Sequence, residues 1–339
     1  MAARHDTLFV CAASFEARCL AGPLSLRNDD YHTDAAIVFY YEHPDLMELR
    51  DDRLNRLSAI LDDVSGKHLQ VIPCDLYEPQ AGMRAMSASE YFHKLTHSGG
   101  TCTMDTSTLT KKHLLMLMRF LDVSGNPPSR LLYTKTANPI YSKLTEGILS
   151  VDAIPGFAGS VSAHRPTRLI LFLGFEAERA MAVWRYYEPA SAVAVLSDVP
   201  STPQWLLRMK EIHRELLQIP TVDSVVVQAG VPSVTWELLR DEIKLRSESH
   251  DICIAPLGSK AQVIGVYEAA RECPEVQVAY CPPHRYLPNY PRRGVGETVF
   301  FSKAKAGEGL HYIRDGVARV SVEESSEAQG TDSGKTDAM

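Results

Sequence analysis

The chain has 339 residues, 45% of them hydrophobic and 23% charged, an ordinary globular composition that suffices for one large core or two medium ones. Its formal net charge of -7 disfavours a protein that coats duplex nucleic acid, because such binding needs clustered lysines and arginines. The net charge does not exclude a local basic pocket. No run approaches the roughly 20 uninterrupted apolar residues of a membrane span, and residues 1–7 lack a signal peptide's apolar core. We therefore expect a cytoplasmic protein that contacts no membrane.

The seven cysteines are odd in number, and most lie inside apolar runs, which indicates buried free thiols in a reducing compartment. The sequence contains neither a Cys-x-x-Cys pair nor a Cys/His cluster with zinc spacing. We therefore expect no metal and no other cofactor.

Strands and helices alternate along the first half of the chain. Residues 8–13 form a short apolar run that predicts a strand, and the polar turn at 14–18 leads from it into a helix-like stretch. The pattern then predicts strands and helices in this order: strand 35–40, helix 45–64, strand 69–72, strand 101–104, helix 113–121 and strand 130–133.

The second half has the same order of elements. Residues 168–173 are again apolar, and Phe175-Glu176-Ala177 follows them as Phe15-Glu16-Ala17 follows the first strand. The remaining elements are predicted as strand 191–196, helix 203–218, strand 224–227, strand 252–255, helix 261–271 and strand 276–280. The shared tripeptide and order favour a structural repeat, although a three-residue match also arises by chance and any two Rossmann-like domains share this order.

Strands that alternate with helices at this spacing form βαβ units, whose right-handed crossovers make parallel sheets with helices on both faces. We therefore predict an α/β fold of two tandem Rossmann-like domains with mainly parallel sheets, related by a pseudo-two-fold axis. The expected divisions are a first domain at 1–150, a linker at 151–166, a second domain at 167–321 and a disordered acidic tail at 322–339.

The loops at the carboxyl ends of the strands are the expected ligand site, because helix N-termini point positive partial charge toward that edge of an open sheet. The first loop offers hydroxyl groups and a cation to an anion: Thr106, Ser107, Thr108, Thr110 and Lys111. Gly258, Ser259 and Lys260 offer a shorter version in the second half. The alternative is that these hydroxyls cap a helix and the lysines are solvated.

Polar residues also follow the first strand of each half: Ser14, Glu16 and Arg18, then Glu176 and Arg179. A carboxylate at this edge can bind a ribose hydroxyl or a base amine, and an arginine can bind phosphate bidentately. An ion pair that ties the loop to the helix explains the same residues equally well.

Tyrosines and basic residues follow the last strand of each half, at 133–139 and 280–286. Tyrosines there can stack on a base, and Lys135 or Arg285 can contact phosphate, whereas aromatic residues beside prolines also commonly pack a loop. His284 and Asp105 are candidate acids or bases, although a strand-terminal Asp is often a helix cap or a turn former.

The segment Asp105-Thr106-Ser107-Thr108-Leu109-Thr110-Lys111 follows an apolar strand and opens a helix. It resembles the Asp-x-Thr-Gly-Gly-Thr-Lys signature of CRISPR-associated Rossmann-fold (CARF-like) sensor domains, which bind cyclic oligoadenylates. Pro256-Leu257-Gly258-Ser259-Lys260 is similar to a degenerate second copy, without the leading Asp. Two glycines of the pattern are replaced in the first copy. Those domains usually work as dimers with the ligand across a two-fold axis, so the resemblance implies that this chain forms an equivalent pseudo-dimer alone.

The sequence thus predicts binding of a phosphorylated ligand, a nucleotide or a cyclic oligonucleotide, by a sensor or signalling subunit. The resemblance implies a role in antiviral defence, with a protein partner that carries an effector activity. One alternative is a ring-nuclease-like enzyme that cleaves or modifies a nucleotide phosphate ester, with Asp105 or His284 transferring a proton and Lys111 stabilising developing charge. The other is an interaction subunit of a larger complex whose pockets are vestigial.

Overall fold

A computed structural model describes residues 4–42, 47–137, 145–162, 164–199, 202, 204–287, 294–306 and 309–322. The elements of the first half are β1 His5–Asp6, β2 Leu8–Ala13, α1 Arg18–Asn28, β3 His32–Thr33, β4 Ala36–Glu42, α2 Met47–Ser65, β5 Leu69–Asp75, α3 Gln80–Ser87, α4 Glu90–Ser98, β6 Cys102–Asp105, α5 Lys111–Val123, β7 Arg130–Thr136 and β8 Thr145–Glu146.

The rest of the chain adds β9 Asp152–Ala153, β10 Thr167–Phe172, α6 Ala177–Tyr187, β11 Ser191–Asp198, α7 Gln204–Ile212, α8 Arg214–Leu217, β12 Val222–Gln228, α9 Pro232–Arg246, β13 Asp251–Pro256, α10 Lys260–Glu272, β14 Gln277–Tyr280, β15 Arg285–Tyr286, β16 Val295–Ala306 and β17 Gly309–Ala318.

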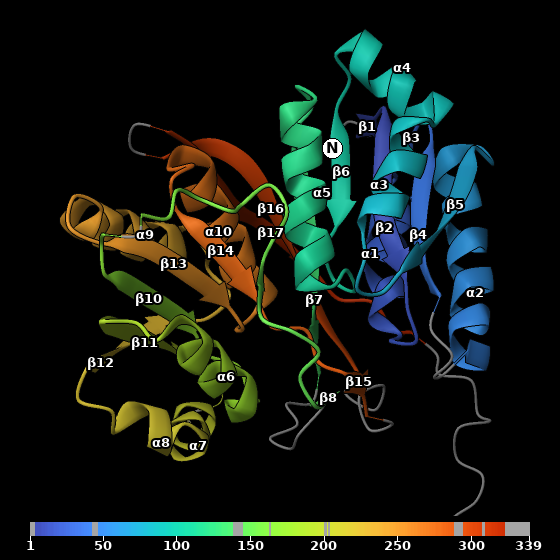
Figure 1. Cartoon of the computed structure of the whole chain (residues 1–339). Coiled ribbons are helices and arrows are strands. Elements are labelled where there is room, and N and C mark those ends of the chain that lie inside the picture. The colour runs from blue at the N-terminus through green and yellow to red at the C-terminus, as the bar shows by residue number, and fades with distance from the viewer. Residues whose placement is uncertain are drawn as a thin grey trace, which may run out of the picture.

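The two large sheets repeat one strand order. The parallel strands of the first sheet run β7-β6-β2-β4-β5, and those of the second run β14-β13-β10-β11-β12. The central strands β2 and β10 are almost wholly buried because helices cover both faces of each sheet, which explains their continuous apolar runs. Figure 1 shows the first half in blue and teal on the right and the second half in green to orange on the left. The predicted α/β class with two mainly parallel sheets is confirmed.

The register of the strands identifies corresponding positions in the two halves. Phe9 pairs with Thr103 of β6, and Leu169 pairs with Cys253 of β13. One strand further, Met104 pairs with Leu131 and Ile254 pairs with Val278. By this register Tyr133 corresponds to Tyr280, Thr134 to Cys281, and Ser107 to Leu257.

The strand pairing differs from the expected domain divisions at two places. The β16–β17 hairpin, which we expected within the second domain, pairs antiparallel with β7 and extends the first sheet to seven strands. Strand β9, inside the expected linker, pairs antiparallel with β14 of the second sheet. The expected tail, apart from residues up to 322, lies outside the described residues.

Helices α5 and α10 pack against each other and join the halves (Figure 1), and the Tyr267 hydroxyl of α10 donates to the Met118 carbonyl of α5 at 3.3 Å. One buried apolar cluster therefore contains residues of both halves, such as Leu117 and Val263. All seven cysteines are unpaired and all but Cys273 are buried. No helix among the described residues is long and apolar enough to cross a membrane.

The β16–β17 hairpin also packs against the second half. Tyr312 of β17 donates its backbone N–H to Oε1 of Glu268 on α10 at 2.8 Å, and its hydroxyl to the Pro128 carbonyl of the first half at 2.6 Å. Glu268 is 1% exposed, and its second carboxylate oxygen has no hydrogen-bond partner among the described residues. Burial raises the pKa of Glu268 to about 7.

Candidate functional site

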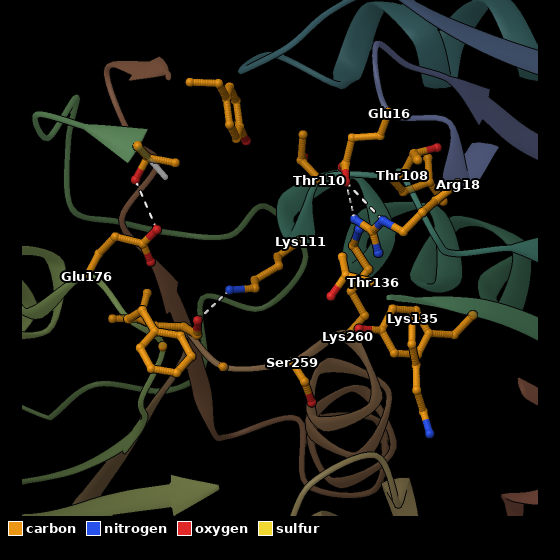
Figure 2. Close-up of a pocket in the computed structure, with 18 of the residues that line it drawn as sticks. Glu16, Arg18, Thr108, Thr110, Lys111, Lys135, Thr136, Glu176, Ser259 and Lys260 are labelled. Carbon is orange, nitrogen blue, oxygen red and sulfur yellow. Dashed lines mark hydrogen bonds and ion pairs between the residues drawn. The ribbon is translucent and has the colours of Figure 1, made fainter. Parts of the chain in front are cut away.

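A cavity of about 410 Å³ lies where the carboxyl ends of the two sheets face each other. The first half lines it with residues that follow β2, β6 and β7, and the second half with residues that follow β10, β11, β13 and β14. Figure 2 shows the side chains of both halves pointing toward one space. The edge at which a parallel sheet usually binds its ligand is thus present in both halves, and the two edges line a single cavity.

A helix begins at the cavity in each half. Thr110 is the N-cap of α5, and its hydroxyl accepts from the His113 N–H at 3.2 Å. Ser259 is the N-cap of α10 and forms a capping box with Gln262. The first helical residue is then Lys111 in one half and Lys260 in the other, so both lysines start at a helix end that carries positive partial charge.

The two lysines bind across the cavity, each to the opposite half. Nζ of Lys111 donates to the Leu257 carbonyl at 2.5 Å, and Nζ of Lys260 donates to the Ser107 carbonyl at 2.6 Å (Figure 2 shows the first bond). Because Ser107 and Leu257 correspond by strand register, this exchange is symmetric. Desolvation, followed by the charges of Arg179 and Lys260, lowers the pKa of Lys111 well below its usual range.

Cations outnumber carboxylates in the cavity. Two acidic side chains, Glu16 and Glu176, line it. The six cationic residues that line it are Arg18, Arg50, Lys111, Lys135, Arg179 and Lys260. The cavity is therefore positively charged, in a chain whose formal net charge is -7.

Aromatic rings form part of the cavity wall. Phe15 lies 6.0 Å from Tyr286 between ring centroids, and Phe175 meets Trp205 edge to face at 4.3 Å. Sequence reasoning assigned neither phenylalanine a role beyond the shared tripeptide, and assigned Trp205 to the apolar side of a helix. Their positions directly after β2 and β10 were the available signal for the two phenylalanines.

Most of the residues predicted for the site line the cavity, and a few do not. The lining residues among them are Ser14, Glu16, Arg18, Thr108, Thr110, Lys111, Lys135, Glu176, Arg179, Gly258, Ser259 and Lys260. Lys135 pairs there with Glu297 of β16 at 2.6 Å. The predicted residues outside the lining are Asp105, Thr106, Ser107, His284 and Arg285.

Asp105, Thr106 and Ser107 are buried beneath the cavity and organise its loops. Oδ1 of Asp105 accepts from the Ser107 N–H at 2.8 Å and from the Ser107 hydroxyl, which itself accepts from the Thr134 N–H at 2.8 Å. The Thr106 hydroxyl donates to the Leu132 carbonyl at 2.7 Å. Burial raises the pKa of Asp105 to about 6. These contacts hold the loop after β6 against the end of β7.

His284 and Arg285 lie on an exposed ribbon beside the cavity. Arg285 pairs with Glu146 at 2.6 Å, and β15 pairs antiparallel with β8 through these two residues. His284 is exposed, and its backbone carbonyl accepts from the Tyr77 hydroxyl at 2.8 Å. Within the described part of the chain, no cluster of three or more His, Cys, Asp or Glu side chains is arranged to hold a metal ion.

No protein-family model matches the chain, and no curated protein matches it. Among solved structures, it is similar to a type III CRISPR defence DNA nuclease activated by cyclic oligoadenylate, with a TM-score of 0.48 and 11% sequence identity. The match covers 81% of this chain and 65% of the nuclease, which is less than two thirds of that protein. Similarity to the Anabaena protein HepE in complex with UDP has a TM-score of 0.18 and 9% identity, over 78% of this chain and 90% of HepE. At these levels of similarity the comparisons assign no function to the chain.

Proposed function

We propose that the cavity binds a phosphorylated ligand, and that the ligand is a nucleotide or a cyclic oligonucleotide. The observation that carries this proposal is the concentration of six cationic side chains and two helix N-termini around one cavity of an acidic protein. Helix N-termini and lysine ammonium groups both stabilise phosphate, and a partly enclosed site strengthens these interactions because water screens them less.

The walls of the cavity favour a ligand with aromatic bases over a simple anion. Phe15, Phe175 and Trp205 offer apolar ring surface beside the lysines, and base stacking on aromatic side chains is sequence-tolerant and favourable. Because cations and rings come from both halves, a ligand with several phosphates and several bases satisfies more of the lining than a mononucleotide does.

The resemblance of the Asp105–Lys111 segment to CARF-like signatures favours a cyclic oligonucleotide among these ligands. In that case the chain acts as a sensor or signalling subunit in antiviral defence, and its output passes to a protein partner. Lys111 and Lys260 each donate to a backbone carbonyl of the opposite half, which supports this role. A phosphate that binds either ammonium group also changes a contact between the two halves.

The test is binding of cyclic oligoadenylates by isothermal titration calorimetry. Lys111→Gln combined with Lys260→Gln keeps a hydrogen-bond donor but removes both charges, so affinity should fall by roughly 100-fold or more. Lys112→Gln is the matched control, because Lys112 is adjacent in sequence yet donates to the Tyr77 carbonyl outside this cavity. Equal affinity of the double variant and the wild type contradicts the proposal.

The same samples distinguish binding from catalysis. Chromatography of the recovered ligand shows whether it stays intact, as expected of a sensor, or is cleaved, as expected of the ring-nuclease-like alternative. The candidate proton-transfer groups Asp105 and His284 do not line the cavity, so no geometric observation favours the enzyme.

A further inference from the structure

Two arginines at the start of α1 and α6 occupy similar places but have different contacts. In the first half, Nε and Nη2 of Arg18 donate to Oε2 of Glu16 at 2.9 and 2.5 Å, and Nη1 donates to the Thr134 carbonyl at 2.9 Å. Every nitrogen of this guanidinium therefore has a protein acceptor. The side chains of Arg18 and Glu16 are 6% and 9% exposed. This pair ties the loop after β2 to the end of β7.

In the second half the guanidinium is held at one end only. Nε of Arg179 donates to the Cys281 carbonyl at 2.6 Å, and Cys281 corresponds to Thr134 by strand register. Nη1 lies 3.9 Å from Oε2 of Glu176, beyond hydrogen-bond distance. Nη2 is buried and has no hydrogen-bond partner among the described residues. Arg179 lines the cavity, and its guanidinium thus has one nitrogen, Nη2, without a hydrogen-bond partner among the described residues.

The spacing of the pairs explains this difference. Glu16 and Arg18 are two residues apart, whereas Glu176 and Arg179 are three apart with Glu176 at the N-cap position of α6. Glu176 also accepts from the hydroxyl of Thr145, a residue of β8, at 3.3 Å. With one additional residue in the second half, the guanidinium lies at ion-pair distance from its carboxylate, 3.9 Å, but makes no hydrogen bond to it.

We propose that Arg179 is a phosphate-binding residue of the cavity, that Arg18 is a structural residue, and that the ligand is consequently held asymmetrically by two halves of similar fold. This inference depends on the proposed function. A phosphate oxygen pair matches the two Nη groups of a guanidinium, and the ring of Tyr280, 5.2 Å from the Arg179 guanidinium, supports its plane.

Nearby charges agree with an anion at this position. The positive charge of Arg179 contributes, after burial, to the lowered pKa of Lys111, so the two cations repel each other in the free protein. A phosphate between them replaces that repulsion with two attractions. Glu176 opposes the phosphate, because its carboxylate is the nearest acidic group to Arg179 among the described residues.

The test measures ligand affinity and melting temperature in three variants, with cyclic oligoadenylates of three to six nucleotides as probes. Arg179→Lys removes the bidentate fork and should weaken binding by about tenfold or more, while it lowers the melting temperature of the free protein less than Arg18→Lys does, because Arg179 makes one hydrogen bond and Arg18 makes three. Arg18→Lys should do the reverse, lowering the melting temperature and affecting affinity less than Arg179→Lys does. Glu176→Gln should strengthen binding severalfold, because it removes a competing carboxylate.

The outcomes separate this inference from the function on which it depends. Absence of binding of every probe to the wild type overturns both. Binding to the wild type that Arg179→Lys retains, or that Arg18→Lys abolishes as thoroughly as Arg179→Lys, overturns the asymmetric assignment alone. Weaker binding in Glu176→Gln also overturns it, because Arg179 then acts through Glu176.

Discussion

The raised pKa of the buried Glu268 carboxyl group leads to a quantitative prediction about the contact between the β16–β17 hairpin and α10. Burial raises the pKa of Glu268 from its ordinary value of 4.5 to about 7, so the folded protein binds a proton there more tightly than the unfolded chain does. The resulting stabilisation is fully present below the unfolded pKa and is lost as the pH rises through the folded pKa. Between about pH 5 and about pH 8, this shift of the pKa lowers the free energy of unfolding by about 2.5 kcal/mol.

Urea unfolding of the wild type and Glu268→Gln across this pH range isolates the effect. The amide still accepts from the Tyr312 N–H but does not titrate, so Glu268→Gln should gain about 2.5 kcal/mol relative to the wild type on going from pH 5 to pH 8. Burial lowers the pKa of neighbouring His311, which acts in the opposite direction but is present in both proteins. Glu211→Gln, at a side chain that is 69% exposed, controls for the loss of a surface carboxylate. If the free energies of unfolding of the wild type and of Glu268→Gln change in parallel with pH, the raised pKa of Glu268 is refuted.

Two further substitutions test the packing and capping beneath the cavity. Gly22→Ala places a Cβ 2.2 Å from Oδ2 of Asp105, so it should destabilise the protein by about 1–3 kcal/mol in chemical denaturation; a neutral result would mean that α1 shifts freely. Ser259→Ala removes the N-cap acceptor that faces Gln262 and should cost about 1 kcal/mol, measured in the same way, while an unchanged midpoint would show that the remaining half of the capping box suffices.

The parallel core of the fold was predictable because its strands are short, buried and almost wholly apolar. Residues 8–13 predicted β2 without error, and residues 168–173 predicted β10 to within one residue. Helix α9 was missed although Pro232 at its start and Trp236, Leu239 and Ile243 on its buried side are a recognisable helix pattern. The sequence signal for this helix is therefore present in the chain.

The β16–β17 hairpin was missed for a physical reason. Its partner β7 lies more than 150 residues earlier in the chain, and nothing in the local pattern of residues 295–318 specifies which of two sheets they extend. The candidate site shows the same limit. The local pattern predicted helix starts at 113 and 261, two residues and one residue after the observed starts at Lys111 and Lys260. The bonds of these lysines to the opposite half depend on how α5 docks against α10.

The return of the chain to the first sheet has a mechanical consequence. The second half leaves the first sheet after β7 and rejoins it at β16, the strand directly beside β7, so it is an insertion anchored at both ends rather than a domain on a single tether. The two crossings between the halves thus lie at neighbouring strands, and the buried apolar cluster that both halves share adds a further connection between them.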